Sequence, residues 1–259
     1  MIKSFDGKVA LVTAAGAGIG AATAQALARK GAMVMLSDTN EEAGQAQIEH
    51  LLKSGARVDF LRADATNEED IERLVQLTVE TFGGLHIAAN VVGAAHPEAV
   101  GPEFHLQSRL GWDATIALTM TSVFLSMKHE IAHMVENGGG TICNIASLAG
   151  MTFIPDGGVG YSAAKAAVIR MTKFAAVNYA DRNIRVNCVA PGVTLTNAFQ
   201  RFDHEERAKM LERHLQGHAI KRGIEPNEQA DAIVFLCSDG AAMITGHTMP
   251  VDGGWAAHF

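Results

Sequence analysis

The chain has little cysteine, no excess of basic charge and no long apolar run, and each absence excludes a class of protein. Its 259 residues include three cysteines, Cys143, Cys188 and Cys237, at wide spacing and with no Cys-x-x-Cys pair. An odd number of scattered cysteines is typical of reduced thiols. We therefore expect a cytoplasmic protein and not a secreted protein stabilised by disulfides.

The charge balance argues against two kinds of partner. Lys and Arg together number 21 and Asp and Glu number 28, which gives a formal net charge of −7. No basic block stands out, so we expect no nucleic-acid partner. The longest apolar candidate, Leu85 to Ala95, is too short to span a bilayer and contains His86 and Asn90. No membrane partner is expected.

Apolar strand-like runs alternate with helical patterns along nearly the whole chain. This alternation predicts an α/β protein with one doubly wound, Rossmann-like domain over residues 1–259. We expect a parallel sheet of about seven strands with helices on both faces. The expected strands are 8–13, 32–37, 57–61, 86–89, 141–146, 185–189 and 248–251. The expected helices are 18–30, 41–53, 68–82, 112–136, 161–179 and 228–237.

Two stretches interrupt this alternation, and both follow expected strands. Residues 93–111 contain two prolines and are predicted to form a loop. Residues 194–217 contain a charged helical run, which we expect to be a helical segment that covers the substrate. Ligands bind at the carboxyl ends of the strands in open α/β sheets, which is where both stretches begin.

A glycine-rich turn lies between the first strand and the first helix. Gly16, Gly18 and Gly20 permit a tight turn and the close approach of a pyrophosphate, whose charge the helix N-terminus favours. Glycine triplets are common, but the position of this one between a strand and a helix is the context that the motif requires. The pattern predicts a bound dinucleotide.

Asp38 ends the second strand, 18 residues after Gly20. A carboxylate at this point can accept hydrogen bonds from both ribose hydroxyls of NAD and would repel the 2′-phosphate of NADP. No basic residue stands at Ala17 or Thr39 to bind such a phosphate. The sequence therefore predicts NAD as the cofactor. The alternative is that Asp38 caps the next helix, a role that Asn40 could also fill.

Three further residues follow strands on the same edge of the sheet. Asp64 could accept a hydrogen bond from the adenine amino group, and a turn aspartate ahead of Thr66 is an equal alternative. Asn90 and Gly93 follow the fourth strand and would bring their loop near the adenosine, although an isolated Asn and Gly would indicate only a turn.

Tyr161 and Lys165 lie four residues apart in a strongly helical run, and therefore share one face of a helix. A cation beside a phenol stabilises the phenolate, so such a tyrosine can exchange protons near neutral pH. General acid–base chemistry on an alcohol or ketone needs such a group. The alternative is a chance pair on a solvated helix.

A possible metal motif lies on the long helix. His129-Glu130-Ile-Ala-His133 matches the zinc-protease pattern His-Glu-x-x-His. Two histidines one turn apart could share a metal ion, but the sequence offers no identifiable third ligand. We expect no metal site.

In this order, these residues resemble the short-chain dehydrogenase/reductase family, and the resemblance extends over essentially the whole chain. It rests on Thr13-x-x-x-x-Gly18-x-Gly20, Asn90-Val-Val-Gly93, the set Ser147, Tyr161 and Lys165, Pro191-Gly192-x-Thr194, and Val251-Asp-Gly-Gly254. There are two departures. Ala14 replaces a loop glycine, which we expect the turn to tolerate with a negative φ. Thr119 stands where the family has an asparagine that holds a water against the catalytic lysine.

The resemblance implies hydride transfer between a secondary alcohol or ketone and NAD. Tyr161 would be the general acid/base, Lys165 would lower the pKa of Tyr161 and bind the nicotinamide ribose, and Ser147 would orient the substrate oxygen. Thr119 would be a member of the proton relay. The resemblance also implies a homotetramer. Further cofactor contacts are implied for Thr13, Ile19, Ala65, Pro191, Gly192, Val193 and Thr194.

The substrate is less constrained by the sequence. Apolar residues in the two stretches and after the fifth strand predict a largely apolar or cyclic substrate. The candidate lining residues are Leu148, Met151, Phe153, Val193, Phe199, Phe202, Met210 and Leu215. Two alternatives stay open: an NADPH-dependent ketone or 3-oxoacyl reductase, and a nucleotide-sensing protein of the same fold without catalytic activity.

Overall fold

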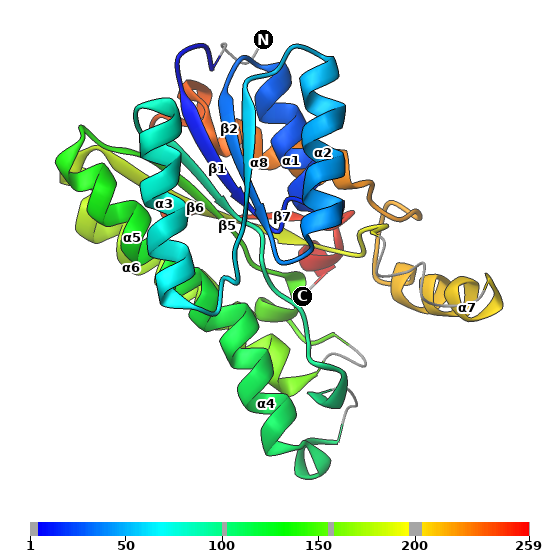
Figure 1. The fold of residues 1–259 in the computed structure, drawn as a ribbon. Coiled ribbons are helices and arrows are strands. Elements are labelled where there is room, and N and C mark those ends of the chain that lie inside the picture. Colours follow the sequence, from blue (N-terminus) through cyan, green and yellow to red (C-terminus); the bar gives the residue numbers. More distant parts are fainter. Residues whose placement is uncertain (1–4, 100–102, 155–157, 197–203, 259) are drawn as a thin grey trace.

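The computed structural model describes residues 5–99, 103–154, 158–196 and 204–258. Within these residues, seven parallel strands form one sheet in the order β3-β2-β1-β4-β5-β6-β7, with helices on both faces (Figure 1). The expected fold class is confirmed. The strands are β1 (Val9–Thr13), β2 (Met33–Asp38), β3 (Val58–Arg62), β4 (Ile87–Asn90), β5 (Gly140–Ile145), β6 (Ile184–Pro191) and β7 (Thr248–Val251).

The helices form two layers because successive strand residues point to opposite faces of the sheet. One layer contains α1 (Gly18–Arg29), α2 (Glu41–Lys53) and α8 (Pro226–Cys237). The other layer contains α3 (Glu68–Phe82), α5 (Ser122–Glu136) and α6 (Val159–Tyr179). In β1, Leu11 packs into the second layer, whereas Ala10 and Val12 pack into the first. The sheet is therefore buried on both sides.

The chain reverses its winding direction between β1 and β4, which are neighbours in the sheet. β1 leads into α1 on one face, and β4 leads through a loop into α4 (Arg109–Ile116) and α5 on the other. The loops after β1 and β4 therefore separate and leave a crevice at their carboxyl ends, which is the ligand position in doubly wound sheets. α4 and α7 (His204–Leu215) project beyond the sheet (Figure 1).

The long helix differs from the regular helix expected over 112–136. It begins at Arg109 and contains a π-helical segment, Ala117–Thr121, between α4 and α5. A π turn holds one more residue than an α turn, and the 3.6-residue apolar period does not reveal it. The segment buries Thr119, whose hydroxyl donates to the Ala94 carbonyl at 2.9 Å.

By length and composition alone, the helical stretch Arg109–Glu136 could cross a membrane, which corrects the expectation that no run reaches that length. Its α5 part packs against the sheet and α6, and 44% of its most apolar window is buried inside the protein.

A polar cluster is buried between α5, α6 and the centre of the sheet. The Asn90 side-chain amide donates to Glu130 Oε2 and Asn144 Oδ1, both at 3.0 Å. The Asn144 amide in turn donates to Thr172 Oγ1 at 2.9 Å. Burial raises the pKa of Glu130 to about 7, although the hydrogen bond from Asn90 opposes this shift.

The members of the His-Glu-x-x-His pattern have different surroundings in the structure. Glu130 faces the core, whereas His129 contacts Glu68 on the surface at 3.2 Å. Among the described residues, no group of three or more His, Cys, Asp or Glu is close enough to hold a metal ion.

We predict that Glu130→Gln reduces the pH dependence of stability. The folded protein holds a proton on Glu130 up to about pH 7, whereas the unfolded chain releases it near the ordinary pKa of 4.5. The free energy of unfolding should therefore fall as the pH rises between these values, by on the order of 3 kcal/mol. Glutamine cannot ionise, so this fall should disappear from urea-unfolding curves.

The control is Glu136→Gln, which changes an exposed carboxylate at the end of the same helix. If the Glu130→Gln curve runs parallel to the wild-type curve from pH 4.5 to pH 7, Glu130 does not titrate in this range.

Candidate functional site

The glycine-rich turn after β1 is tightly closed. A side chain at Gly20 would lie 2.0 Å from the Ala14 carbonyl oxygen, so only glycine lets α1 pack on the turn. Gly18 has a φ of +56°, which glycine adopts readily. Ala14 also has a positive φ, +51°, which corrects the expected negative value. For alanine this backbone costs on the order of 1 kcal/mol.

The N-terminus of α1 is open to an anion. Ala17 is the N-cap residue, and among the described residues no side chain forms a capping hydrogen bond there. The first turn, which contains Ile19, has no acidic residue. The first N–H groups of a helix lack helical acceptors and attract phosphate. The turn after β6 reaches over this point, since a Cβ on Gly18 would lie 3.3 Å from Thr196 Cγ2. The arrangement fits a pyrophosphate.

The Asp38 carboxylate is held in place by two backbone N–H groups. Oδ2 accepts from Gly16 at 3.0 Å and Oδ1 accepts from Asn40 at 2.9 Å. The cap of α2 is Asn40, whose side chain accepts from Ala43 at 3.0 Å. The alternative of Asp38 as the helix cap is therefore wrong. A carboxylate oriented at the end of β2 can accept hydrogen bonds from ribose hydroxyls.

Sequence reasoning missed Arg62, which is the register partner of Asp38 at the end of β3. Its Nε donates to the Thr39 carbonyl at 3.2 Å, and its side chain is exposed. Only the adjacent ends of the second and third strands could have pointed to it. A cation therefore does lie beside the acidic residue that would contact the ribose.

Several other residues predicted to contact the cofactor have structural partners. Thr13 Oγ1 accepts from the Val91 N–H at 3.0 Å and ties the ends of β1 and β4 together. Asp64 Oδ1 accepts from the backbone N–H and the hydroxyl of Thr66, both at 2.8 Å. This is the alternative role stated above, that of a turn aspartate ahead of Thr66. Ala65 is buried beside it. The Asn90 side chain points into the core, so only its backbone faces the loop.

The three predicted catalytic side chains lie together. Ser147 follows β5, and its side chain lies near the phenol of Tyr161 on α6, where it lowers the tyrosine pKa. Ser147 Oγ also accepts from the Ala149 N–H at 3.1 Å. Lys165 is buried, with Nζ 5.7 Å from the centroid of the Tyr161 ring and 2.6 Å from the Ile145 carbonyl, to which it donates.

The electrostatics of this group differ from the expectation in one respect. Burial raises the pKa of Tyr161, and the hydrogen bond from Ser147 lowers it. Burial also lowers the pKa of Lys165 to about 7. We expected the Lys165 cation to lower the tyrosine pKa, but this ammonium is itself desolvated and faces the Ile145 carbonyl. The protein interior alone thus favours the neutral phenol.

Gly93 leaves the space that Lys165 occupies. Its φ is +151°, and a Cβ there would lie 2.6 Å from Lys165 Nζ and 3.4 Å from Thr119 Cγ2. The π segment therefore places Thr119 beside the lysine, although its hydroxyl donates to the Ala94 carbonyl.

The turn after β6 is fixed by the end of β7 and by α8. The Gly192 N–H donates to the Val251 carbonyl at 2.9 Å, and Thr194 Oγ1 accepts from the Gln229 amide at 3.1 Å. Pro191 is the last residue of β6. Sequence reasoning missed a further partner, the buried His218, which accepts from the Val193 N–H at 3.3 Å.

The residues predicted to line the substrate do not behave as one group. Leu148 is buried in the protein, whereas Met151 and Phe153 are exposed, the latter by 82%. Val193 and Leu215 are partly buried. Phe199, Phe202 and the side chain of Met210 lie outside the described part of the chain.

Known proteins resemble this chain along its full length. A family model described as Enoyl-(Acyl carrier protein) reductase matches residues 13–256. A cyclohexanol dehydrogenase from Acinetobacter sp. (strain SE19) is 37% identical over 99% of this chain and 98% of that protein. A solved structure of levodione reductase superposes with a TM-score of 0.92 at 32% identity, covering 98% and 100% of the two chains. The chain belongs to the short-chain dehydrogenase/reductase family.

A further family member, a 2,5-dichloro-2,5-cyclohexadiene-1,4-diol dehydrogenase from Sphingobium indicum (strain DSM 16412 / CCM 7286 / MTCC 6364 / B90A), is 39% identical over 99% of this chain and all of that protein. Membership in the short-chain dehydrogenase/reductase family confirms an oxidoreductase. The family uses nicotinamide cofactors, and the uncapped α1 N-terminus together with Asp38 fits such a group.

We predict that Gly93→Ala destabilises the protein and disturbs Lys165. The new methyl group would meet Lys165 Nζ and force a backbone conformation that alanine rarely adopts. The expected loss in free energy of unfolding is about 1–3 kcal/mol by urea titration. Gly84→Ala is the control, because Gly84 is outside the left-handed φ region and its Cβ would approach only the His86 ring, at 3.3 Å. Equal effects of the two changes would contradict the prediction.

Proposed function

We propose that the protein is an NAD-dependent dehydrogenase of apolar, cyclic secondary alcohols. The observation that carries this proposal is the group formed by Ser147, Tyr161 and Lys165 at the same sheet edge as Asp38. The names of two relatives, cyclohexanol dehydrogenase and the cyclohexadiene-diol dehydrogenase, describe ring alcohols as substrates and support the cyclic class.

In the proposed reaction, Tyr161 is the general base for alcohol oxidation. Its phenolic oxygen takes the proton of the substrate hydroxyl, and Ser147 hydrogen-bonds the substrate oxygen and the phenol. Oxidised nicotinamide, when bound, accepts the hydride and brings a positive charge to the site. Because burial raises the pKa of Tyr161, phenolate formation requires added positive charge near the ring.

Lys165 is proposed to bind the nicotinamide ribose and to pass protons onward. With a pKa lowered to about 7, its ammonium can lose and regain a proton near neutral pH. Thr119 is proposed to hold a water of this relay as a hydrogen-bond acceptor. Its hydroxyl donates to Ala94, so its oxygen would act as an acceptor.

The choice of NAD is proposed from Asp38. A carboxylate fixed by two backbone N–H groups repels the 2′-phosphate of NADP at close range. The neighbouring Arg62 acts in the opposite direction, since a guanidinium binds phosphate well. We propose that Asp38 dominates because backbone bonds hold it in place, whereas Arg62 is exposed.

Loops after β4 and β5 surround the N-terminal end of α6, which carries Tyr161. A Cβ on Gly158 would lie 2.4 Å from the Ala99 carbonyl oxygen, and one on Gly160 would lie 3.4 Å from the Trp112 ring. These loops present Phe104 and Phe153 to solvent, with exposures of 73% and 82%. Exposed aromatic rings on the loops around this end of α6 favour an apolar substrate.

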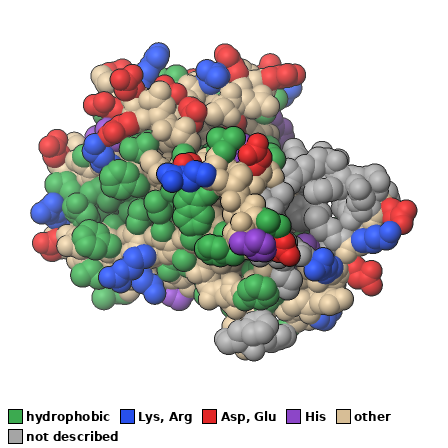
Figure 2. Space-filling model, turned by 90° about the horizontal axis from the view of Figure 1, so that it is seen from below, with side chains coloured by type: hydrophobic (Ala, Val, Ile, Leu, Met, Phe, Trp, Pro, Cys, Tyr) green, Lys and Arg blue, Asp and Glu red, His purple; other side chains and the backbone are tan. Residues whose placement is uncertain are grey.

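We also propose a homotetramer and a cytoplasmic location. Phe174 and Val177 on α6 are 63% and 80% exposed, and Phe124 on α5 is 52% exposed. Figure 2 shows hydrophobic side chains gathered over the side of the molecule that contains these helices. Such a patch is typical of a subunit interface. The three buried, reduced cysteines are consistent with the cytoplasm.

We predict that Tyr161→Phe abolishes most of the activity and leaves NAD binding nearly unchanged. The substitution removes the proton acceptor and keeps the ring, so turnover should fall by about 10²–10⁴-fold. Absorbance of reduced nicotinamide with a panel of cyclic secondary alcohols measures turnover, and calorimetry measures NAD binding.

The matched control is Tyr179→Phe at the other end of α6. Its ring lies beside Arg182, with the guanidinium 5.4 Å from the ring centroid, and it is assigned no role in the reaction. Tyr161 loses its proposed role if the Tyr161→Phe enzyme keeps more than about a tenth of the rate. NAD binding without turnover of any alcohol in the wild type would favour a nucleotide sensor.

We predict that Asp38→Ala narrows or reverses the preference for NAD over NADP. Removing the carboxylate removes the repulsion and leaves Arg62 beside the ribose. In the double variant Asp38→Ala/Arg62→Ala, the gain in NADP use should be smaller. The ratio of kcat/KM for the two cofactors measures the effect. An unchanged ratio in Asp38→Ala would show that another residue determines the cofactor preference.

A further inference from the structure

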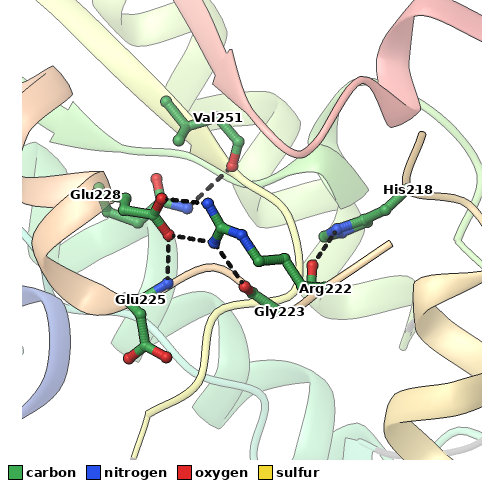
Figure 3. Close-up of polar contacts among 7 residues, drawn as sticks. His218, Arg222, Gly223, Glu225, Glu228 and Val251 are labelled. Carbon is green, nitrogen blue, oxygen red and sulfur yellow. Dashed lines mark hydrogen bonds and ion pairs between the residues drawn. The ribbon is translucent and has the colours of Figure 1, made fainter. Parts of the chain in front are cut away.

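His218 is a buried side chain in the segment between α7 and α8, outside the catalytic group. Its Nε2 lies 3.3 Å from the Val193 backbone nitrogen. Its Nδ1 lies 3.1 Å from the Arg222 carbonyl oxygen, as Figure 3 shows. An N–H can only donate and a carbonyl can only accept. The ring must therefore be neutral, with its proton on Nδ1.

The surrounding chain is shaped to fit this ring. A Cβ on Gly192 would lie 3.0 Å from Nε2, and one on Gly253 would lie 2.9 Å from Nδ1. The rings of Trp255 and His218 form a T-shaped pair, with centroids 5.8 Å apart. The ends of β6 and β7 can thus close on His218 only because both carry glycine there.

The segment that offers the Arg222 carbonyl is itself fixed. Arg222 forms a bidentate ion pair with Glu228 at 2.6 and 2.7 Å, and Glu228 accepts from the Glu225 N–H at 2.9 Å (Figure 3). His218 therefore connects a rigid support at the start of α8 to the turn after β6.

Within that turn, Val193 is the residue that is hydrogen-bonded to the His218 ring. Its carbonyl accepts from the Ile224 N–H at 2.9 Å, and its N–H donates to His218. The turn contains the Pro191-Gly192-x-Thr194 pattern, which the family resemblance assigns to the nicotinamide side of the cofactor.

We propose that neutral His218 is a positioning residue that fixes the Val193 amide, and that protonation of the ring releases the turn and weakens NAD binding. The proposal rests on the proposed function, because it takes NAD as the ligand of this turn. A protonated ring would carry hydrogen on both nitrogens, so Nε2–H would oppose the Val193 N–H.

The charged groups around the ring determine where this change falls. Burial lowers the pKa of His218 below its ordinary value of 6.5; the Arg222 carbonyl and Asp252 raise it, and Lys221 lowers it. Asp252 is fixed by the Gly254 and Ala256 N–H groups. The neutral ring therefore persists at neutral pH. Its contribution is complete above pH 6.5 and is lost as the pH falls through the lowered pKa.

Two substitutions test the two hydrogen bonds of His218, to Val193 and to Arg222, separately. His218→Gln can place its amide oxygen near the position of Nε2 and keep an acceptor for Val193, whereas His218→Asn reaches only the Nδ1 side and keeps a donor for Arg222. Neither side chain titrates in this range. His247→Gln, which changes an exposed histidine, is the matched control.

The experiment measures the Kd for NAD by calorimetry and the hydrogen–deuterium exchange of the peptide containing Val193, both from about pH 5 to pH 8 on the full chain. In the wild type and in His247→Gln, NAD affinity and protection of this peptide should decrease together at low pH. His218→Gln should retain neutral-pH affinity and show no such decrease. His218→Asn should raise the Kd by about fivefold at neutral pH, the value of one lost hydrogen bond.

Three results would overturn the proposal: equal Kd values for His218→Gln and His218→Asn, a wild-type pH dependence retained in His218→Gln, or lowered thermal stability in both variants without a change in Kd or exchange. The exchange readout does not need the cofactor. If the wild type binds no NAD while Val193 protection still follows pH, then the proposed function fails and the coupling between His218 and the turn stands.

Discussion

The burial of Lys165 is the constraint on which the arrangement of the site depends. Its ammonium donates to the Ile145 carbonyl at the end of β5 and is desolvated there. This contact ties α6 to the sheet and fixes the orientation of the helix face that carries Tyr161. It also requires glycine at position 93, because any side chain would occupy the position of the ammonium. One buried cation thus links the fourth strand, the fifth strand and the catalytic helix.

Local patterns in the sequence predicted the parts of this arrangement that depend on neighbours in the chain. The four-residue spacing of Tyr161 and Lys165 predicted a shared helix face, and the glycines after the first strand predicted a tight turn. The alternation of strands and helices predicted the sheet and its layers. These features depend on apolar periods of two or 3.6 residues and on turn-forming residues. Both can be recognised in a short stretch of sequence.

The features that sequence reasoning missed depend on tertiary neighbours. The spacing of Tyr161 and Lys165 did not show that both side chains are buried, which raises the pKa of the phenol and lowers the pKa of the ammonium. Arg62 was missed because its partner, Asp38, is set by strand register. The partners of His218 and Glu130 lie on other elements far along the chain. No single-sequence period reports such contacts.

Because of the π segment between α4 and α5, the helix can change its length by one residue without turning the faces of α5. A π turn is an α-helix with one extra residue accommodated locally, and the turns on either side keep their orientation. Losing one residue here would therefore leave α5 packed as it is, with Glu130 still facing the core, and would move only the side chains of the segment, Thr119 among them. A family could thus change the residue beside its lysine through a one-residue insertion or deletion without rebuilding its core.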